Sequence, residues 1–274
     1  MHFNKVNLVI IATVITLYTV FDYFLFAKDM GSVIFILFIQ LAFILLAISP
    51  LGAFILRMIY GSRRIETKQD SDYLYPIFGE VYSEVKKEYP QVNSNINLYM
   101  DEDMSINAYA SGSNSITVTR GAMEFLSEEQ LKGVLAHEFG HIVHGDTLVP
   151  LVLLVGNSIF MLIFLFIRFI QLIALGCSLI TGDNFVSSLF NIIVNFSTAI
   201  ILFVIEILLM LNQRANEYQA DKYAVTIGYG EQLIEALYIL KNVSMGHKQS
   251  ILERLKSSHP NINARIGRLE QMQV

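Results

Sequence analysis

Two histidines and a glutamate stand close together near the middle of the chain, in the order His137, Glu138, Phe139, Gly140, His141. On a helix, residues four apart project from one face, so both imidazoles can reach one cation while Glu138 stands beside them. Two neutral imidazoles suit Zn²⁺, which in hydrolytic sites takes three protein ligands and a water. Glu138 would take a proton from that water and pass it to a leaving amine. The pattern favours a hydrolase with one zinc ion per chain, over two incidental histidines on a surface helix.

A third zinc ligand has to come from outside this helix. His144 shares the histidine face, but it lies about 10.5 Å from His137 along the axis, too far for two bonds of about 2 Å to one ion. Glu217 is the best candidate, and Asp221 follows it by four residues. Both carboxylates would face the same way, so Glu217 could ligate zinc while Asp221 hydrogen-bonds the free ring nitrogen of a histidine ligand. Taken alone, Glu217 would be an ordinary acid on a helix surface.

The helix that carries the histidines has a clear beginning. Ser127 is followed three residues later by Gln130, the spacing of a capping box. A helix that starts there would present one apolar side to a core, formed by Leu131, Val134, Leu135 and Phe139.

The polar sequence before this helix predicts an α+β arrangement. Apolar residues recur every four positions over Tyr73–Tyr89, which indicates a helix. Three segments alternate as strands do: Asn95–Met100, Ile106–Ala110 and Ser115–Thr119. The turn-prone string 111–114 joins the last two and predicts a hairpin. The expected fold is mostly helical, with a small sheet beside the histidine helix.

Composition points to a membrane protein. The 274 residues are 54% hydrophobic and only 16% charged, with a mean hydropathy of +0.50, whereas soluble domains carry about 25% charged residues. The net charge of −5 is not clustered as a basic face, so no nucleic-acid partner is expected. The single cysteine excludes a disulfide within the chain.

Four apolar stretches approach the roughly 20 residues that cross a bilayer. They are Leu8–Phe26, Val33–Leu56, Leu148–Leu175 and Phe185–Leu211, and Pro50 should kink or end the second. We expect a transmembrane hairpin over 1–56, a first catalytic part over 57–147, a second hairpin over 148–211 and a second catalytic part over 212–274. A cleaved signal peptide is the less favoured reading of the first stretch, because no small-residue cleavage site follows it.

Basic residues near the span ends predict the orientation. They gather after the second and fourth stretches, as Arg57, Arg63, Arg64, Lys68, Arg214 and Lys222. This places both termini and the polar parts on the cytoplasmic side. The lack of a transit peptide and the short loops favour the plasma membrane of a prokaryote. Helix rise puts the metal about 9–10 Å beyond the apolar edge, so we expect substrates to be membrane proteins or unfolded segments at the bilayer surface. The sequence does not predict an oligomeric state.

Several ordered blocks resemble the HtpX-type membrane proteases of the M48 peptidases, which are related to the Ste24 CAAX prenyl proteases. The blocks are Asn107–Ala110, Thr117–Gly121, Glu129–Glu138, Arg214–Asp221 and Ser258–Pro260 with Arg265 and Ile266. The resemblance implies a zincin-like (gluzincin) catalytic domain on a four-helix membrane anchor, with zinc on His137, His141 and Glu217 and Glu138 as the catalytic residue. It also implies an edge strand at Asn107, Ala108 and Tyr109 that pairs with substrate, and a role in membrane protein quality control.

Other assignments stay open in the sequence. His259 could stabilise an oxyanion or be a turn residue before Pro260. Arg265 could hold a carboxylate near the site or make a structural ion pair, and Glu206 could line a polar path or pair within the bundle. The alternatives to a quality-control protease are a dedicated processing protease of the Ste24 type and a zinc-binding membrane scaffold without proteolytic activity. An intact Glu138 argues against the scaffold, since a structural zinc site needs no general base.

Overall fold

The computed structural model describes residues 5–26, 29–112, 114–147, 166, 169–170, 173, 185–244 and 261–273. The chain divides into two compact units. The first, here the sheet unit, comprises Met1–Leu8, Ile48–Leu151 and Met210–Val274. The second, here the helical unit, comprises Val9–Ala47 and Val152–Leu209.

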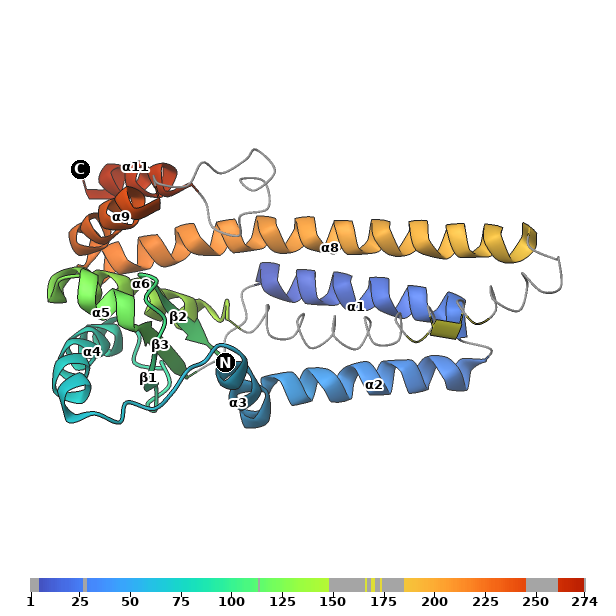
Figure 1. Ribbon diagram of the computed structural model, residues 1–274, viewed down its shortest axis with the longest axis horizontal. Helices are drawn as coiled ribbons and strands as arrows, with labels where there is room; N and C mark the ends of the chain where they lie inside the picture. The colour runs from blue at the N-terminus through green and yellow to red at the C-terminus, as the bar shows by residue number, and fades with distance from the viewer. Residues whose placement is uncertain are drawn as a thin grey trace. The chain divides into compact units, whose positions relative to one another are not determined.

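In the described part of the chain, the helical unit contains most of α1 (Lys5–Phe26) and α2 (Met30–Ile48) and the first part of α8 (Phe185–Thr226) (Figure 1). Among the described residues, the helix Asn195–Thr226 is long and apolar enough to cross a membrane, and an 18-residue window within it has a mean hydropathy of 1.9. The segments Met30–Leu46 and Leu51–Ile59 meet the same criterion only as a broken pair, and Asn7–Leu17 is a shorter apolar stretch. Most of the predicted span over 148–175 lies outside the described residues. The four-span anchor therefore stays a prediction.

The second apolar stretch is not one continuous helix. α2 ends at Ile48, and α3 (Pro50–Ile59) begins after a single intervening residue, Ser49. The prediction that Pro50 ends or kinks the helix is confirmed, and the two helices meet the criterion for a membrane span together as a pair bent by 65°. Pro50 lacks a backbone N–H and suits the first position of the new helix, while the Ser49 hydroxyl accepts a hydrogen bond from the Gly52 N–H at 3.3 Å.

A three-stranded mixed sheet forms the centre of the sheet unit. Its strands are β1 (Asn97–Asp101), β2 (Ala108–Ser111) and β3 (Ser115–Thr119), in the order β1-β3-β2. β3 pairs with β1 in parallel and with β2 in antiparallel register, so the predicted hairpin is confirmed. β2 begins two residues later than expected, because the Asn107 N–H donates to the Thr119 hydroxyl at 3.0 Å instead of to the backbone of β3. β2 is an edge strand of this sheet.

The helix before the sheet is longer than predicted. α4 (Lys68–Glu88) starts five residues ahead of Tyr73, because Thr67 caps it by accepting a hydrogen bond from the Asp70 N–H at 3.1 Å. The buried apolar residues of α4 include Ile77, Val81 and Val85, three of the four positions on which the prediction rested.

The histidine helix is α6 (Glu128–His144), and it follows the short α5 (Arg120–Phe125). The predicted capping box between Ser127 and Gln130 is present in both directions. α6 packs against α4, β2 and α9 (Gly230–Ser244), and α11 (Ile262–Gln273) packs on α9 (Figure 1). One apolar cluster joins these elements, and its fully buried members on α6 are Leu131, Leu135, Ala136 and Phe139.

Candidate metal centre

α6 brings the two motif histidines together. Their Nε2 atoms lie 3.2 Å apart and the rings meet at 87°. His137 is buried, with 5% of its surface exposed, and His141 is half-buried. The helical spacing of four residues therefore turns both ring nitrogens toward one point, as the sequence predicts.

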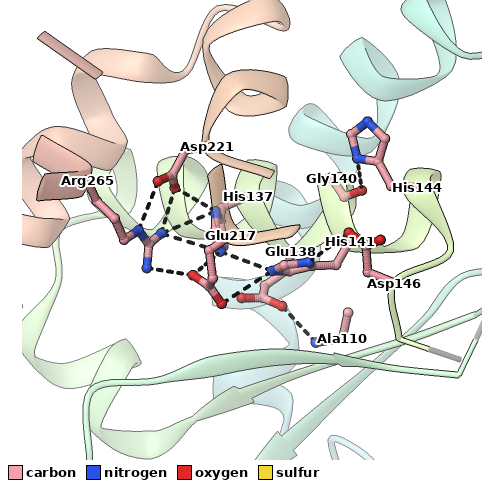
Figure 2. Close-up of polar contacts among 10 residues, drawn as sticks. All are labelled: Ala110, His137, Glu138, Gly140, His141, His144, Asp146, Glu217, Asp221 and Arg265. Atoms are coloured by element: carbon pink, nitrogen blue, oxygen red, sulfur yellow. Dashed lines mark hydrogen bonds and ion pairs between the residues drawn. The ribbon is translucent and has the colours of Figure 1, made fainter. Parts of the chain in front are cut away.

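Glu217 reaches the same point from the sheet-unit part of α8. Its carboxylate oxygens lie 3.5 Å from His137 Nε2 and 3.8 Å from His141 Nε2 (Figure 2). α8 continues without a break from Phe185 to Thr226, so one helix contains both the fourth apolar stretch and Glu217. Among the described residues, His137, His141 and Glu217 form a group whose ligand atoms all lie within 4.8 Å of one another.

This donor set fits one zinc ion. A tetrahedral site with bonds of about 2.0–2.1 Å places its ligand atoms about 3.3 Å apart, close to the Nε2–Nε2 distance of 3.2 Å. Two imidazoles and one carboxylate are the ligands of a catalytic zinc site that keeps a fourth position open.

Gly140 allows the two helices to approach so closely. A Cβ atom at Gly140 would stand 2.9 Å from the Cα of Ala220 and 3.2 Å from its Cβ. Ala220 lies three residues after Glu217, so the contact falls where α8 must come close for its carboxylate to reach the histidines. One of the two variable positions in the histidine motif thus serves helix packing.

Each histidine has a carboxylate behind it. Asp221 Oδ1 lies 2.9 Å from His137 Nδ1, and Asp146 Oδ2 lies 3.4 Å from His141 Nδ1 (Figure 2). Such partners fix the tautomer and direct the other ring nitrogen to the metal. The spacing of Asp221 from Glu217 predicts the first contact, whereas Asp146 is not predicted from the sequence. The signal was local: Gly145 ends α6 in the left-handed conformation, with φ of 70°, which turns Asp146 back toward His141.

Arg265, on α11, lies beside both carboxylates of α8. Its guanidinium donates to the two Asp221 oxygens at 2.9 and 2.6 Å, and it lies 2.8 Å from Glu217 Oε2. Arg265 is only 8% exposed, so its charge is compensated by these partners within the interior. Of the two readings left open for Arg265, the structure favours a role in holding the site carboxylates.

These charges set the protonation of His137. Burial and the Arg265 charge lower the pKa of the imidazole, but hydrogen bonds to Asp221 and Glu217 outweigh them and raise its pKa to about 9. Burial raises the pKa of Asp221, and its hydrogen bond to His137 with the Arg265 charge brings that pKa below the usual range. Zinc binding to His137 would release a proton.

Glu138 is held by the edge strand. Its Oε2 accepts a hydrogen bond from the Ala110 N–H at 2.8 Å (Figure 2), and the side chain is 7% exposed. Thr119 donates its N–H to the Asn107 carbonyl, and the alternation of an antiparallel ladder then turns the N–H and C=O groups of Ala108 and Ala110 away from β3. The backbone of Ala110 is a site contact that the sequence analysis did not name.

A pocket of about 520 Å³, including its open mouth, adjoins these residues. His137, Glu138, Glu217 and Arg265 line one side of it. The rest of its lining is mostly apolar and comes from Ile106, Asn107, Ala108, Leu126, Val134, Leu233, Ala236, Leu237 and Leu240. The α9 residues of this lining carry no local signal, because they reach the site only through packing of α9 on α6.

The other predicted residues lie in different places. Asn107 and Ala108 line the pocket. The Tyr109 side chain points to the face of the strand opposite to Ala108, and its hydroxyl donates to the Tyr60 carbonyl at 2.9 Å. His144 Nδ1 lies 2.7 Å from the Gly140 carbonyl, outside the metal group. His259 falls outside the described residues.

The sequence matches the model of Peptidase family M48 over residues 73–273. The relatives that the sequence resembles include proteins named Protease HtpX homolog. The one from Neisseria meningitidis is 31% identical over 182 residues, 61% of this chain and 62% of its own length. The one from Campylobacter curvus is 26% identical over 232 residues, 75% of this chain and 76% of its own length. The chain thus spans less than two thirds of the length of the Neisseria relative.

The fold resembles that of a solved structure, the crystal structure of S. mikatae Ste24p. The TM-score is 0.56 at 19% sequence identity, covering 94% of this chain and 62% of the other. This likeness concerns the fold.

Proposed function

Because this chain belongs to peptidase family M48, we propose that it is a zinc-dependent endopeptidase of membrane or unfolded proteins. The observation that carries the proposal is the convergence of His137, His141 and Glu217 beside Glu138. The similarity to proteases named HtpX homolog supports it.

His137, His141 and Glu217 would hold the zinc ion. When bound, the ion would act as a Lewis acid toward the scissile carbonyl and the attacking water. Glu138 would accept the proton of that water and deliver it to the leaving nitrogen. The Ala110 N–H holds one oxygen of Glu138 at 2.8 Å, which orients the carboxylate. Asp221 and Asp146 would keep the ligand rings in place, and Arg265 would position Asp221.

The β2 edge is the proposed seat of the substrate backbone. Ala108 and Ala110 turn their polar backbone groups away from β3, beside a pocket that Asn107 and Glu138 line. An extended peptide could add to this edge as a further strand, with one apolar side chain in the pocket. This arrangement needs little sequence specificity, which suits a protease for unfolded segments.

The membrane setting is part of the proposal. Four spans, a cytoplasmic sheet unit and the plasma membrane of a prokaryote agree with the apolar stretches and the distribution of Lys and Arg. Substrates would then be membrane proteins cleaved near the cytoplasmic surface, as expected of a quality-control protease.

The test is cleavage of an unfolded soluble protein by the detergent-purified full chain, zinc-loaded and after chelation. Wild type should cleave only with zinc. Glu138→Gln should keep one zinc ion per chain and lose about 10²–10⁴-fold in rate. An inactive wild type with bound zinc would argue against a general endopeptidase, and a wild type without zinc would overturn the ligand assignment.

A further inference from the structure

Helix α3 carries its apolar side chains on the side that the sheet unit leaves uncovered. They follow the spacing i, i+3, i+4, i+7, i+8 and are Leu51, Phe54, Ile55, Met58 and Ile59, here the α3 stripe. Their exposed fractions run from 41% for Ile55 to 66% for Met58. A surface helix in water turns such a stripe toward the core, so α3 has the opposite arrangement.

The other side of α3 is held on the sheet. The Arg57 guanidinium donates to the Ser115 hydroxyl at 3.3 Å and lies over the Tyr99 ring at 5.0 Å. Ala53 lies beside Gly112 in the β2–β3 turn, and Gly52 is buried. These contacts direct the one charge of α3 away from the stripe, so the helix cannot hide the stripe by rotating without losing them.

The segments on both sides of α3 suggest what covers the stripe. Before it, α2 and the break at Ser49 carry no charged residue from Met30 onward. After it, Arg63, Arg64 and Lys68 are exposed, against one acidic residue, Glu66. The apolar stripe is thus followed in the sequence by exposed basic residues. This combination is suited to a bilayer surface, where the apolar side chains contact acyl chains and the basic side chains contact anionic headgroups.

We propose that the α3 stripe lies in the headgroup–acyl boundary of a lipid bilayer and holds the β2 edge beside the membrane surface. α3 packs against β2, and the Tyr109 hydroxyl of β2 bonds to the Tyr60 carbonyl just after α3 at 2.9 Å. The strand proposed to bind substrate is thus attached to the helix that lies in the boundary. This inference rests on the proposed membrane-bound protease, and it specifies the substrate as polypeptide emerging from the bilayer surface.

The first test measures lipid contact of single labels on the full chain in nanodiscs of phosphatidylcholine and phosphatidylglycerol. Cys177→Ala provides the background, and a fluorophore is attached in turn at Met58→Cys, Phe203→Cys and Gln271→Cys. Phe203 lies in the apolar part of α8, and Gln271 is an exposed polar residue of α11. Quenchers are placed in water, near the lipid headgroups and deep in the acyl chains.

We expect the Met58 label to be quenched from the headgroup depth, the Phe203 label from the acyl depth and the Gln271 label only from water. The α3 inference would be overturned if the water-soluble quencher reached the Met58 label as strongly as the Gln271 label. If the Phe203 label were still quenched from the acyl chains, this result would not contradict the membrane anchor. A Phe203 label quenched from water would instead overturn the anchor. Shielding of Met58 from all three quenchers, with energy transfer between labels, would show that a second copy covers the stripe and would also overturn the inference.

The second test compares two substrates. Phe54→Glu should lower cleavage of a membrane-anchored test protein about fivefold, while cleavage of a soluble unfolded protein changes less than about twofold. Met272→Glu, a matched change at an exposed apolar residue of α11, should leave both rates unchanged. Equal losses of Phe54→Glu on both substrates would contradict the proposal.

Discussion

The metal centre and α3 depart from the usual distribution of residues in opposite directions. At the metal centre, charged groups such as Glu138, Glu217, Asp221 and Arg265 are buried. On α3, large apolar side chains are exposed. Both arrangements cost folding free energy in water. Arg265 compensates part of the carboxylate charge at the metal centre, and we propose that a bound cation compensates the rest and that a lipid surface covers the α3 stripe.

Removing a metal ligand is the largest expected change in this comparison. Glu217→Ala should abolish zinc binding and lower peptidase activity by at least about 10³-fold, because two histidines alone hold the ion weakly. Zinc content per chain and cleavage of an unfolded protein measure this. Glu231→Ala, at an exposed acid of α9, is the control and should behave as wild type. Full zinc occupancy in Glu217→Ala would contradict the ligand assignment.

A smaller effect is expected when the helices are pushed apart. Gly140→Ala places a methyl group 2.9 Å from the Ala220 Cα, which should cost about 1–3 kcal/mol of stability. We also expect weaker zinc binding, because α8 carries Glu217. Thermal unfolding and zinc titration should move together. Gly79→Ala lies inside α4, where nothing stands within 4 Å of the added carbon. It should gain about 0.5–1 kcal/mol of stability with unchanged zinc binding. An unchanged zinc affinity in Gly140→Ala would show that the approach of α8 is not limiting.

Loss of the Asp221 charge beside His137 should lower zinc affinity more than it lowers the stability of the fold. Asp221→Asn removes the charge that faces His137 Nδ1 at 2.9 Å, and loss of such a partner lowers zinc affinity about 10- to 100-fold. Competition with a zinc chelator measures this. Because Arg265 also loses an ion-pair partner, Arg265→Gln is a useful comparison, since it keeps Asp221. Zinc affinity equal to that of wild type in Asp221→Asn would exclude the orienting role.

The smallest effect is expected at Tyr109, whose hydroxyl joins β2 to the segment after α3. Tyr109→Phe removes the hydroxyl that contacts the Tyr60 carbonyl at 2.9 Å and Ser62 Oγ at 3.0 Å. We expect a loss of about 1 kcal/mol in stability, with unchanged zinc binding. Denaturant unfolding measures the first and zinc content the second. A loss of zinc would mean that Tyr109 contributes to the metal centre, although it lies outside the metal group and the pocket lining.

Much of the site could be read from spacing within single elements. The four-residue separation of His137 and His141, the capping box at Ser127 and the helix break at Pro50 are local features, because hydrogen bonding and side-chain direction within one helix repeat regularly. The start of β2 was predicted less accurately. The Asn107 N–H donates to the Thr119 hydroxyl instead of to a backbone carbonyl of β3, so the strand begins later than the alternation indicates.

Contacts between distant segments required the tertiary structure. Arg265 meets Asp221 across 44 residues of sequence, and Ala110 meets Glu138 across 28. Neither contact has a local pattern, because each depends on how α11 or β2 packs against the histidine helix. The apolar side of α3 belongs to the same class: its periodicity is visible in the sequence, but the sheet contacts of Arg57 decide that the stripe faces outward. The spacing of His137 and His141 alone identifies a pair that can bind one metal ion, because helical geometry turns both side chains to one face. Packing between elements decided what holds those groups and which surface remains uncovered.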